Sequence, residues 1–218
     1  TGLQAQAFVV AFRLPNLFRD LVAEGAMTTA VVPVLSAYRA TKPTQEFWRL
    51  AQATGARMAV IVGVLGAAGV IAAPWLVRLI APGFVGDPEK FALTVQLTRI
   101  FFPFITLVGL WAFFCGLLNS LRHFAMPALG PAVLNVAMIS GCLWLAPWMH
   151  PPVMGVAVGL MIGGVLQLVM QLPVALRLGF RWRWVWRHEG SRDMIRLLTP
   201  RLFGAAVYQV SVLFNTVL

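Results

Sequence analysis

Residues 124–176, FAMPALGPAVLNVAMISGCLWLAPWMHPPVMGVAVGLMIGGVLQLVMQLPVAL, contain no Asp, Glu, Lys or Arg. A membrane-spanning helix needs about 20 mostly apolar residues, because it rises about 1.5 Å per residue across about 30 Å of hydrocarbon. The stretch is therefore long enough for two such helices. Backbone groups in lipid must pair within the protein, and runs this long and continuous favour helices over barrel strands.

The whole chain shares this apolar character. Hydrophobic residues make up 60% and charged residues 11% of the 218 positions, and the mean hydropathy is +0.82. A soluble domain carries roughly 25% charged residues, because its surface must be solvated. The net charge of +10 would suggest nucleic acid in a soluble protein, but here the basic residues gather in particular loops. The composition predicts a membrane protein without a nucleic-acid partner.

Six apolar segments account for most of the chain. They cover residues 4–38, 58–80, 91–118, 124–148, 153–176 and 194–218. The first is unusual because polar residues interrupt its middle. The pattern predicts an all-α fold, a polytopic membrane helical bundle with about six transmembrane helices and no soluble catalytic domain.

Basic residues occur in every second loop, as the positive-inside rule requires. The first loop carries Arg39, Lys42, Arg49 and Arg57, the third Arg122, and the fifth six arginines between 177 and 196. We therefore expect loops one, three and five on the cytoplasmic side. The first segment then runs inward, with one preceding helix as the simplest count. The start at Thr1 and the end within an apolar run favour a piece of a longer protein, a partial transmembrane domain over residues 1–218.

Tryptophan and arginine alternate in the fifth loop. Trp182, Trp184 and Trp186 are interleaved with Arg181, Arg183 and Arg187. Such alternation is used to bind single-stranded nucleic acid. Beside a membrane span it more often anchors the chain to anionic lipid at the interface, and we favour that interpretation.

Catalytic chemistry has little support in the sequence. No nucleophile–base pair, phosphate-binding loop or metal-ligand spacing occurs, so we expect no enzyme activity, no cofactor and no metal site. Cys115 and Cys142 lie within apolar runs and are interpreted as small hydrophobic residues.

The most informative stretch is FRLPNLFRDLVAEGA, residues 12–26, because it places four ionisable side chains inside an apolar segment. Charged groups in a membrane are costly and normally face a bundle interior or a water-filled cavity. An ideal helix turns by about 100° per residue, so four polar residues form one stripe along it. Each lies within about 20° of the centre line of the stripe, measured around the helix axis. They are Gln6, Arg13, Asp20 and Glu24.

Arg19 lies roughly 120° from this polar stripe on an ideal helix. An arginine-lined cavity suits an anionic ligand, since a guanidinium binds phosphate through paired hydrogen bonds. The alternative is that the first segment ends near Phe12 and the charged stretch is a cytoplasmic loop. Residues 25–38 are again uncharged until the next loop, and this run would have no obvious place in that alternative.

A family resemblance rests on several motifs in order. AFVVAFRLPNLFR at residues 7–19, followed by AEGA at 23–26, resembles the second membrane helix of the MurJ (MviN) lipid II flippases. Further matches are VP (32–33), APW (73–75), APGF (81–84), KFALT (90–94), FP (102–103), PA (127–128) and GGVLQL (163–168). Each match is weak alone, but together they cover the chain.

The resemblance implies a fold and a function. The family belongs to the multidrug/oligosaccharidyl-lipid/polysaccharide exporter superfamily and has fourteen helices in two lobes around a central cavity. It moves lipid II, the undecaprenyl-pyrophosphate-linked peptidoglycan precursor, to the outer leaflet by alternating access. This chain would hold helices two to seven, most of the first lobe, in the cell inner membrane, and residues 1–218 alone should not flip lipid II in liposomes.

The resemblance also implies roles for particular residues. Arg19 matches a cavity arginine and would bind the pyrophosphate, and Glu24 matches an acid that would pair with cavity arginines in one state. Arg13 lies where relatives carry a basic residue, and Asn16, in the same motif, completes the substrate-binding set. Gln6 departs from the pattern, because the family usually has Asp there, and a neutral amide cannot form the same ion pair.

Two other functions remain open. One is export of another lipid-linked saccharide or a drug within the same superfamily. The other is a non-transporting membrane scaffold that holds cell-wall synthesis proteins through its basic loops. Lipid II, membrane lipids and cell-wall synthesis proteins are the partner classes that these hypotheses imply.

Overall fold

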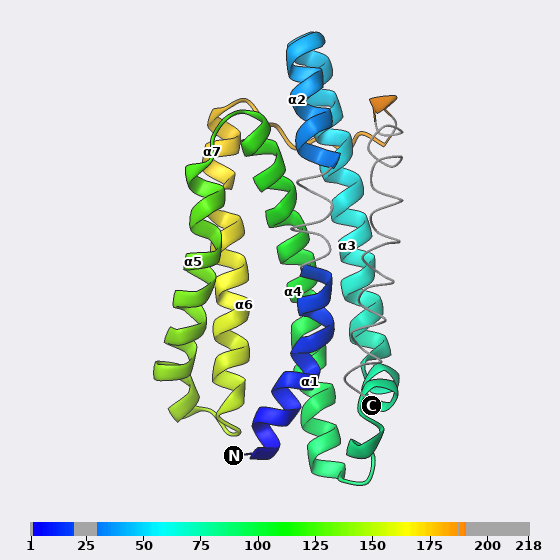
Figure 1. Ribbon diagram of the computed structural model, residues 1–218, viewed down its shortest axis with the longest axis vertical. Coiled ribbons are helices and arrows are strands. Elements are labelled where there is room, and N and C mark those ends of the chain that lie inside the picture. The colour runs from blue at the N-terminus through cyan, green and yellow to red at the C-terminus, as the bar shows by residue number, and fades with distance from the viewer. Residues whose placement is uncertain (1, 20–29, 187, 191–218) are drawn as a thin grey trace.

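The computed structural model describes residues 2–19, 30–186 and 188–190, and these form an elongated bundle of helices (Figure 1). The α-helices are α1 (Gly2–Arg19), α2 (Val32–Thr41), α3 (Thr44–Ile80), α4 (Pro88–Ser120), α5 (Ala125–Ser140), α6 (Val153–Val169) and α7 (Leu172–Arg177). A 3-10 turn covers Pro82–Phe84, a π turn Gly141–Leu145 and a second 3-10 turn Ala146–Trp148. No strand occurs within these described ranges, so the expected all-α fold is confirmed.

Four stretches in the described part of the chain are long and apolar enough to cross a membrane. They are Thr44–Ile80, Pro88–Ser120, Ala125–Trp148 and Val153–Arg177. These correspond to the second to fifth expected segments. The first expected segment is represented by α1 and α2 on either side of residues 20–29, and the sixth, from residue 194, lies outside the described residues.

The connections alternate between the two ends of the bundle (Figure 1). The α2–α3 and α4–α5 connections lie at the end marked by α7, and the α3–α4 and α5–α6 connections lie at the end of the N-terminus. This is the weaving path that loop charges predict. The end that carries α7 has most of the arginines, in helix ends and connections, and is therefore expected to lie on the cytoplasmic side.

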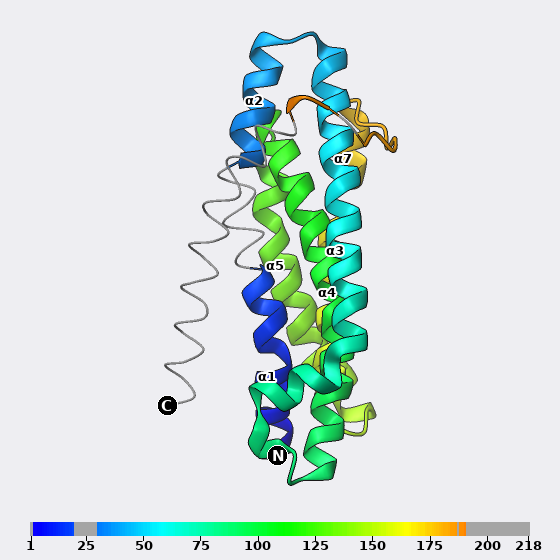
Figure 2. The same ribbon diagram turned by 90° about the vertical axis from the view of Figure 1, so that its right-hand side faces the viewer.

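One part of the expected topology was wrong. Arg49 and Arg57 were assigned to the first loop, but both lie in α3, which begins at Thr44. The connection from α2 is only Lys42 and Pro43, and the first turns of α3 extend with α2 past the end of α4 (Figure 2). Because this part of α3 carries charged residues, we expect it to lie outside the hydrocarbon. There its charged residues favour the helix, for example through the Glu46–Arg49 pair, spaced i,i+3 at 3.3 Å.

Helix α4 is the centre of the bundle. In its most apolar window 61% of the residues are buried, against 17% for the stretch Ala125–Trp148. Its start is well defined, because Pro88 occupies the first turn and the Asp87 carboxylate accepts a hydrogen bond from the Lys90 backbone N–H at 3.1 Å. Helix α4 therefore provides the surface against which α1, α3 and α6 pack.

Two apolar clusters form the core along α4. The cytoplasmic cluster joins α2, α3 and α4 to Phe180 and includes Leu35, Leu50, Phe113 and Leu117. The outer cluster joins α1, α4, α5 and α6 and includes Ala7, Phe101, Phe104, Leu134 and Leu160. Because lipid is as apolar as these side chains, close packing rather than hydrophobic burial holds such helices together.

Small residues allow a close approach between α5 and α6. Gly155, Gly159 and Gly163 are spaced four residues apart on α6, the small-xxx-small pattern of membrane helix pairs. A Cβ added at Gly159 would lie 2.8 Å from the Ala137 carbonyl oxygen and 2.8 Å from the Gly141 Cα. The two backbones therefore touch at this point.

Candidate functional site

Helix α1 packs on α4 through one face. Ala7 and Ala11 are buried there, with exposed fractions of 0% and 2%. Next to these small residues, the rings of Phe8 and Phe12 make edge contacts with Phe101 of α4, at centroid distances of 5.3 and 5.6 Å. The alanines allow close approach and the phenylalanines fix the orientation of α1.

The candidate polar residues lie on the other side of α1. On an ideal helix Gln6, Arg13 and Asn16 lie between about 120° and 160° from the line through Ala7 and Ala11. Gln6 is exposed, and Arg13 and Asn16 are partly buried. The side of α1 that carries Arg13 and Asn16 therefore faces away from the alanine contact with α4, whereas Gln6, near the start of α1, reaches the first turn of α4 through Lys90. A charged helix face directed away from its own lobe suits the wall of a cavity shared with a second group of helices.

The helical backbone continues through the charged motif. Helix α1 runs from Gly2 to Arg19 and includes Arg13, Pro15 and Asn16. The alternative in which the chain leaves the helix near Phe12 was therefore wrong for residues 13–19. Arg19 is the last residue of α1, and its side chain lies outside the described part, as do Asp20 and Glu24. Their assignment to the site stays a prediction.

The outer end of α1 is fastened to the start of α4 by a contact that the sequence did not indicate. The Lys90 ammonium donates a hydrogen bond to Gln6 Oε1 at 2.5 Å and lies 3.9 Å from the centroid of the Phe84 ring. Lys90 was recognised only as part of a motif, and its separation of 84 residues from Gln6 gives no local signal. The contact places a cation beside the position where the family resemblance implies Asp.

Replacing Gln6 with Glu is expected to stabilise the protein slightly, by about 0.2–1 kcal/mol, because an exposed ion pair with Lys90 is screened by solvent. Thermal unfolding of the purified protein measures the change. In the Lys90→Met background the same substitution should give no gain. A gain of equal size in that background would show that Gln6 acts through another partner.

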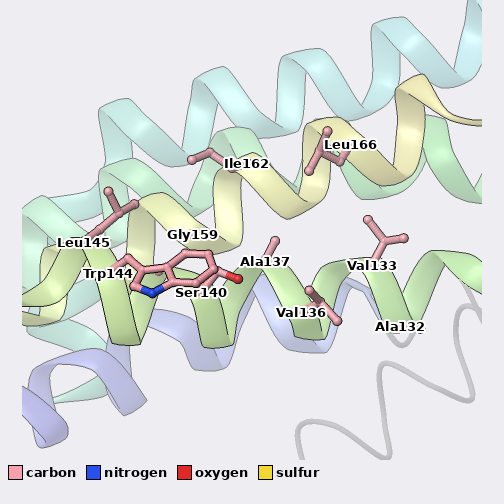
Figure 3. A pocket seen from close by; sticks show the side chains of 11 residues that line it. Ala132, Val133, Val136, Ala137, Ser140, Trp144, Leu145, Gly159, Ile162 and Leu166 are labelled. Atoms are coloured by element: carbon pink, nitrogen blue, oxygen red, sulfur yellow. The ribbon is translucent and has the colours of Figure 1, made fainter.

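An apolar groove of about 500 Å³ lies between α5 and α6 (Figure 3). Val136, Ala137 and Trp144 line it from the α5 side, and Ile162 and Leu166 from α6. Its lining includes no charged side chain, so it does not fit a pyrophosphate. The polar face of α1 is the better candidate for an anionic headgroup.

Three buried polar atoms lack a hydrogen-bond partner within the described part of the chain: Trp111 Nε1, Gln167 Nε2 and Gln171 Oε1. Gln171 Nε2 donates to Cys115 Sγ at 3.3 Å, so α4 meets the end of α6 through polar groups. Nothing in the sequence pattern indicates that Trp111, Gln167 and Gln171 come together, and Cys115 was interpreted only as a small hydrophobic residue. Nor do the described residues contain a group of three or more His, Cys, Asp or Glu side chains that could hold a metal ion.

Comparison with known proteins gives a consistent result. The family model "Lipid II flippase MurJ" matches residues 1–218. A lipid II flippase MurJ from Burkholderia cenocepacia is 36% identical over 216 residues, which cover 96% of this chain and 42% of that protein. A probable lipid II flippase MurJ from Haemophilus influenzae is 34% identical and covers 100% of this chain and 44% of that protein.

A solved structure has the same fold. The structure of lipid II flippase MurJ in an inward closed conformation superposes with a TM-score of 0.78 at 22% identity, covering 97% of this chain and 43% of that one. The chain thus spans less than half the length of the relatives that it matches.

Proposed function

The chain belongs to the MurJ family of lipid II flippases, and from this premise we propose that it forms helices two to seven of the first lobe of such a flippase. It is a multi-pass membrane protein. In this proposal the intact protein moves lipid II from the cytoplasmic to the periplasmic leaflet of the cell inner membrane by alternating access. It supplies precursor for peptidoglycan biosynthesis, and so for cell-wall biogenesis and cell shape.

The observation that carries the proposal is the orientation of α1. Its alanine face is buried on α4, and its polar side, with Gln6, Arg13 and Asn16, is directed away from that contact. A lobe that keeps polar side chains on a face turned away from its main helix contact provides a path for a charged headgroup. The undecaprenyl tail can stay in lipid meanwhile, because only the headgroup must avoid the hydrocarbon.

The charges of the motif suit a pyrophosphate. Arg13 and Arg19 supply guanidinium groups, which bind phosphate oxygens through paired, charge-assisted hydrogen bonds. Asp20 and Glu24 temper the positive field and offer partners for the arginines when no substrate is bound. The protein's role in this scheme is binding and release; no bond of the substrate is made or broken, so the proposed activity is transport rather than catalysis.

The test is complementation with the intact gene in cells depleted of their own lipid II flippase. Growth, together with lipid II reaching the outer leaflet, supports the proposal. Continued arrest with inward-facing lipid II, at normal expression of the protein, contradicts it.

A competition experiment distinguishes lipid II transport from export of another substrate of the same superfamily. Soluble lipid II headgroup should inhibit transport by the purified intact protein in liposomes, whereas an unrelated drug substrate should not. Inhibition by the drug with no effect of the headgroup would favour the exporter.

A further inference from the structure

A basic pocket lies at the cytoplasmic end, between the first turns of α3 and the chain that follows α7. It has a volume of about 220 Å³. Arg49 lines it from α3, and Arg181 and Arg183 line it from the segment after α7. Gln45, Trp48 and Gln52 complete the α3 side. Three arginines and two glutamines around one small cavity are suited to a phosphate group.

The segment that supplies two of these arginines is held in place by its backbone. After α7 the chain turns at Gly179, whose φ of 107° favours glycine, and buries the Phe180 ring against Phe113 and Phe114. Gln52 Nε2 then donates to the Arg181 carbonyl oxygen at 2.8 Å. These contacts fix the path of the chain while leaving the Arg181 and Arg183 side chains exposed.

A second set of contacts fixes the far end of the same segment. Arg57 Nε donates to the Trp186 carbonyl oxygen at 3.0 Å, and the His188 ring lies 3.1 Å from a Glu46 carboxylate oxygen. Figure 1 shows the segment running from α7 towards α3. The two arginines thus sit between two anchored points.

The pocket has an excess of positive charge. Neither Arg181 nor Arg183 makes a side-chain hydrogen bond or ion pair within the residues that the structure describes. Glu46, the acid near this end of α3, is shared between Arg49, at 3.3 Å, and His188. An anion that enters the pocket therefore meets two guanidinium groups that no described carboxylate neutralises.

The pocket lies just outside the level of the lipid headgroups, within reach of long side chains. The uncharged part of α3, residues 58–77, crosses about 30 Å at 1.5 Å per residue, the thickness of the hydrocarbon. Gln52 lies six residues before it, about 9 Å further out, near the outer limit of a headgroup layer that is about 5–7.5 Å deep. Arginine side chains from this level reach back into the headgroup layer.

Exposed aromatic rings lie on the same segment. Trp182, Trp184 and Trp186 are 40%, 59% and 54% exposed, and their rings follow one another at centroid distances of 5.8 and 6.0 Å. Tryptophan concentrates at the membrane interface, because its ring is apolar and its N–H is polar. The aromatic row indicates that the segment contacts the membrane surface rather than open solvent.

We propose that the pocket formed by Arg49, Arg181, Arg183 and Gln52 binds the phosphate of an anionic phospholipid of the cytoplasmic leaflet. The guanidinium groups bind the phosphate oxygens, and the tryptophan row contacts the neighbouring lipid. This site is separate from the polar face of α1 and does not depend on which substrate the protein carries. It gives the sequence-based lipid anchor a defined binding pocket.

Native mass spectrometry of the intact protein in detergent tests the site with phosphatidylglycerol, phosphatidylcholine of the same acyl chains, and inorganic phosphate. Phosphatidylglycerol should bind in preference to both. The R181Q/R183Q variant should weaken phosphatidylglycerol binding at least about tenfold, since charge-assisted hydrogen bonds are lost. The matched control is R122Q/R177Q, which removes the same charge from exposed positions at the same end and should change binding less than about twofold.

Three results would overturn the proposal. Equal weakening in both double variants would indicate diffuse attraction, and equal binding of phosphatidylcholine would indicate recognition of acyl chains. Inorganic phosphate that binds as tightly as the lipid would indicate a free-anion site. If R181Q/R183Q does not fold, Arg49→Gln decides, because it leaves the segment after α7 intact: a several-fold loss of affinity supports the site, and unchanged affinity overturns it.

Discussion

Cells that depend on the intact protein with Arg19 replaced by Ala are expected to stop growing and to accumulate inward-facing lipid II. Arg19 ends α1, and we propose that its guanidinium binds the pyrophosphate of the precursor. Removing one partner of a hydrogen-bonded charge pair costs about 2–5 kcal/mol, so transport should fall by at least an order of magnitude. Growth at matched expression, and the sidedness of lipid II, measure the effect.

Two matched variants separate this role from a general need for positive charge. Arg19→Lys keeps the charge but loses the paired hydrogen bonds, so it should retain partial function. Removing the charges of the last cytoplasmic loop should do less harm than Arg19→Ala; these residues are Arg177, Arg181, Arg183, Arg187, Arg192 and Arg196. A silent Arg19→Ala with severe loss from the loop changes is the order that a cell-wall scaffold predicts.

Replacing Gly159 with Leu is expected to remove most of the folded protein. A Cβ at this position would meet the Ala137 carbonyl oxygen and the Gly141 Cα, both at 2.8 Å. Because both atoms are backbone atoms, one in α5 and one at the start of the π turn that follows it, no side-chain rotation relieves the clash. The cost should reach or exceed the upper end of the usual overpacking range of about 1–3 kcal/mol. Thermal unfolding and the monodisperse fraction in size-exclusion chromatography measure the loss.

Gly63 is the matched control for this change. It lies on α3, and in the described structure no atom of a neighbouring helix lies within 4 Å of a Cβ added there. Gly63→Leu should therefore unfold within a few degrees of the parent protein, since its Cβ meets no described neighbour. If both variants were equally stable, close backbone contact between α5 and α6 would not be what holds these helices together.

The membrane fold could be predicted because its signal is local. The length of each apolar run indicates a span, as for α4 and for residues 124–176, and the loop charges indicate the weaving path. The start of α3 was missed because hydropathy marks only the part of a helix that lies in hydrocarbon. Helix α3 begins earlier, in a stretch that carries the charged residues Glu46 and Arg49.

The contacts that shape the candidate sites could not be predicted, because they join residues far apart in the chain. Gln6 and Lys90 are separated by 84 positions, and Gln52 and Arg181 by 129. Alternating Trp and Arg residues indicated an interfacial segment, but only the fold brings Arg181 and Arg183 to Arg49. The polar stripe on α1 was predictable from helical periodicity as far as Arg13; the roles of Arg19 and Glu24 stay predictions.

The central claim is that the polar side of α1 contacts lipid II during transport. A photo-crosslinking amino acid at Val9, an exposed position between Gln6 and Arg13, or at Asn16 tests it in the intact protein with labelled lipid II. Ile71, 69% exposed on α3, is the control that faces lipid. We expect crosslinks at positions 9 and 16 and none at 71. Equal crosslinking at 71, or none at 9 and 16 in cells that grow, would contradict the account.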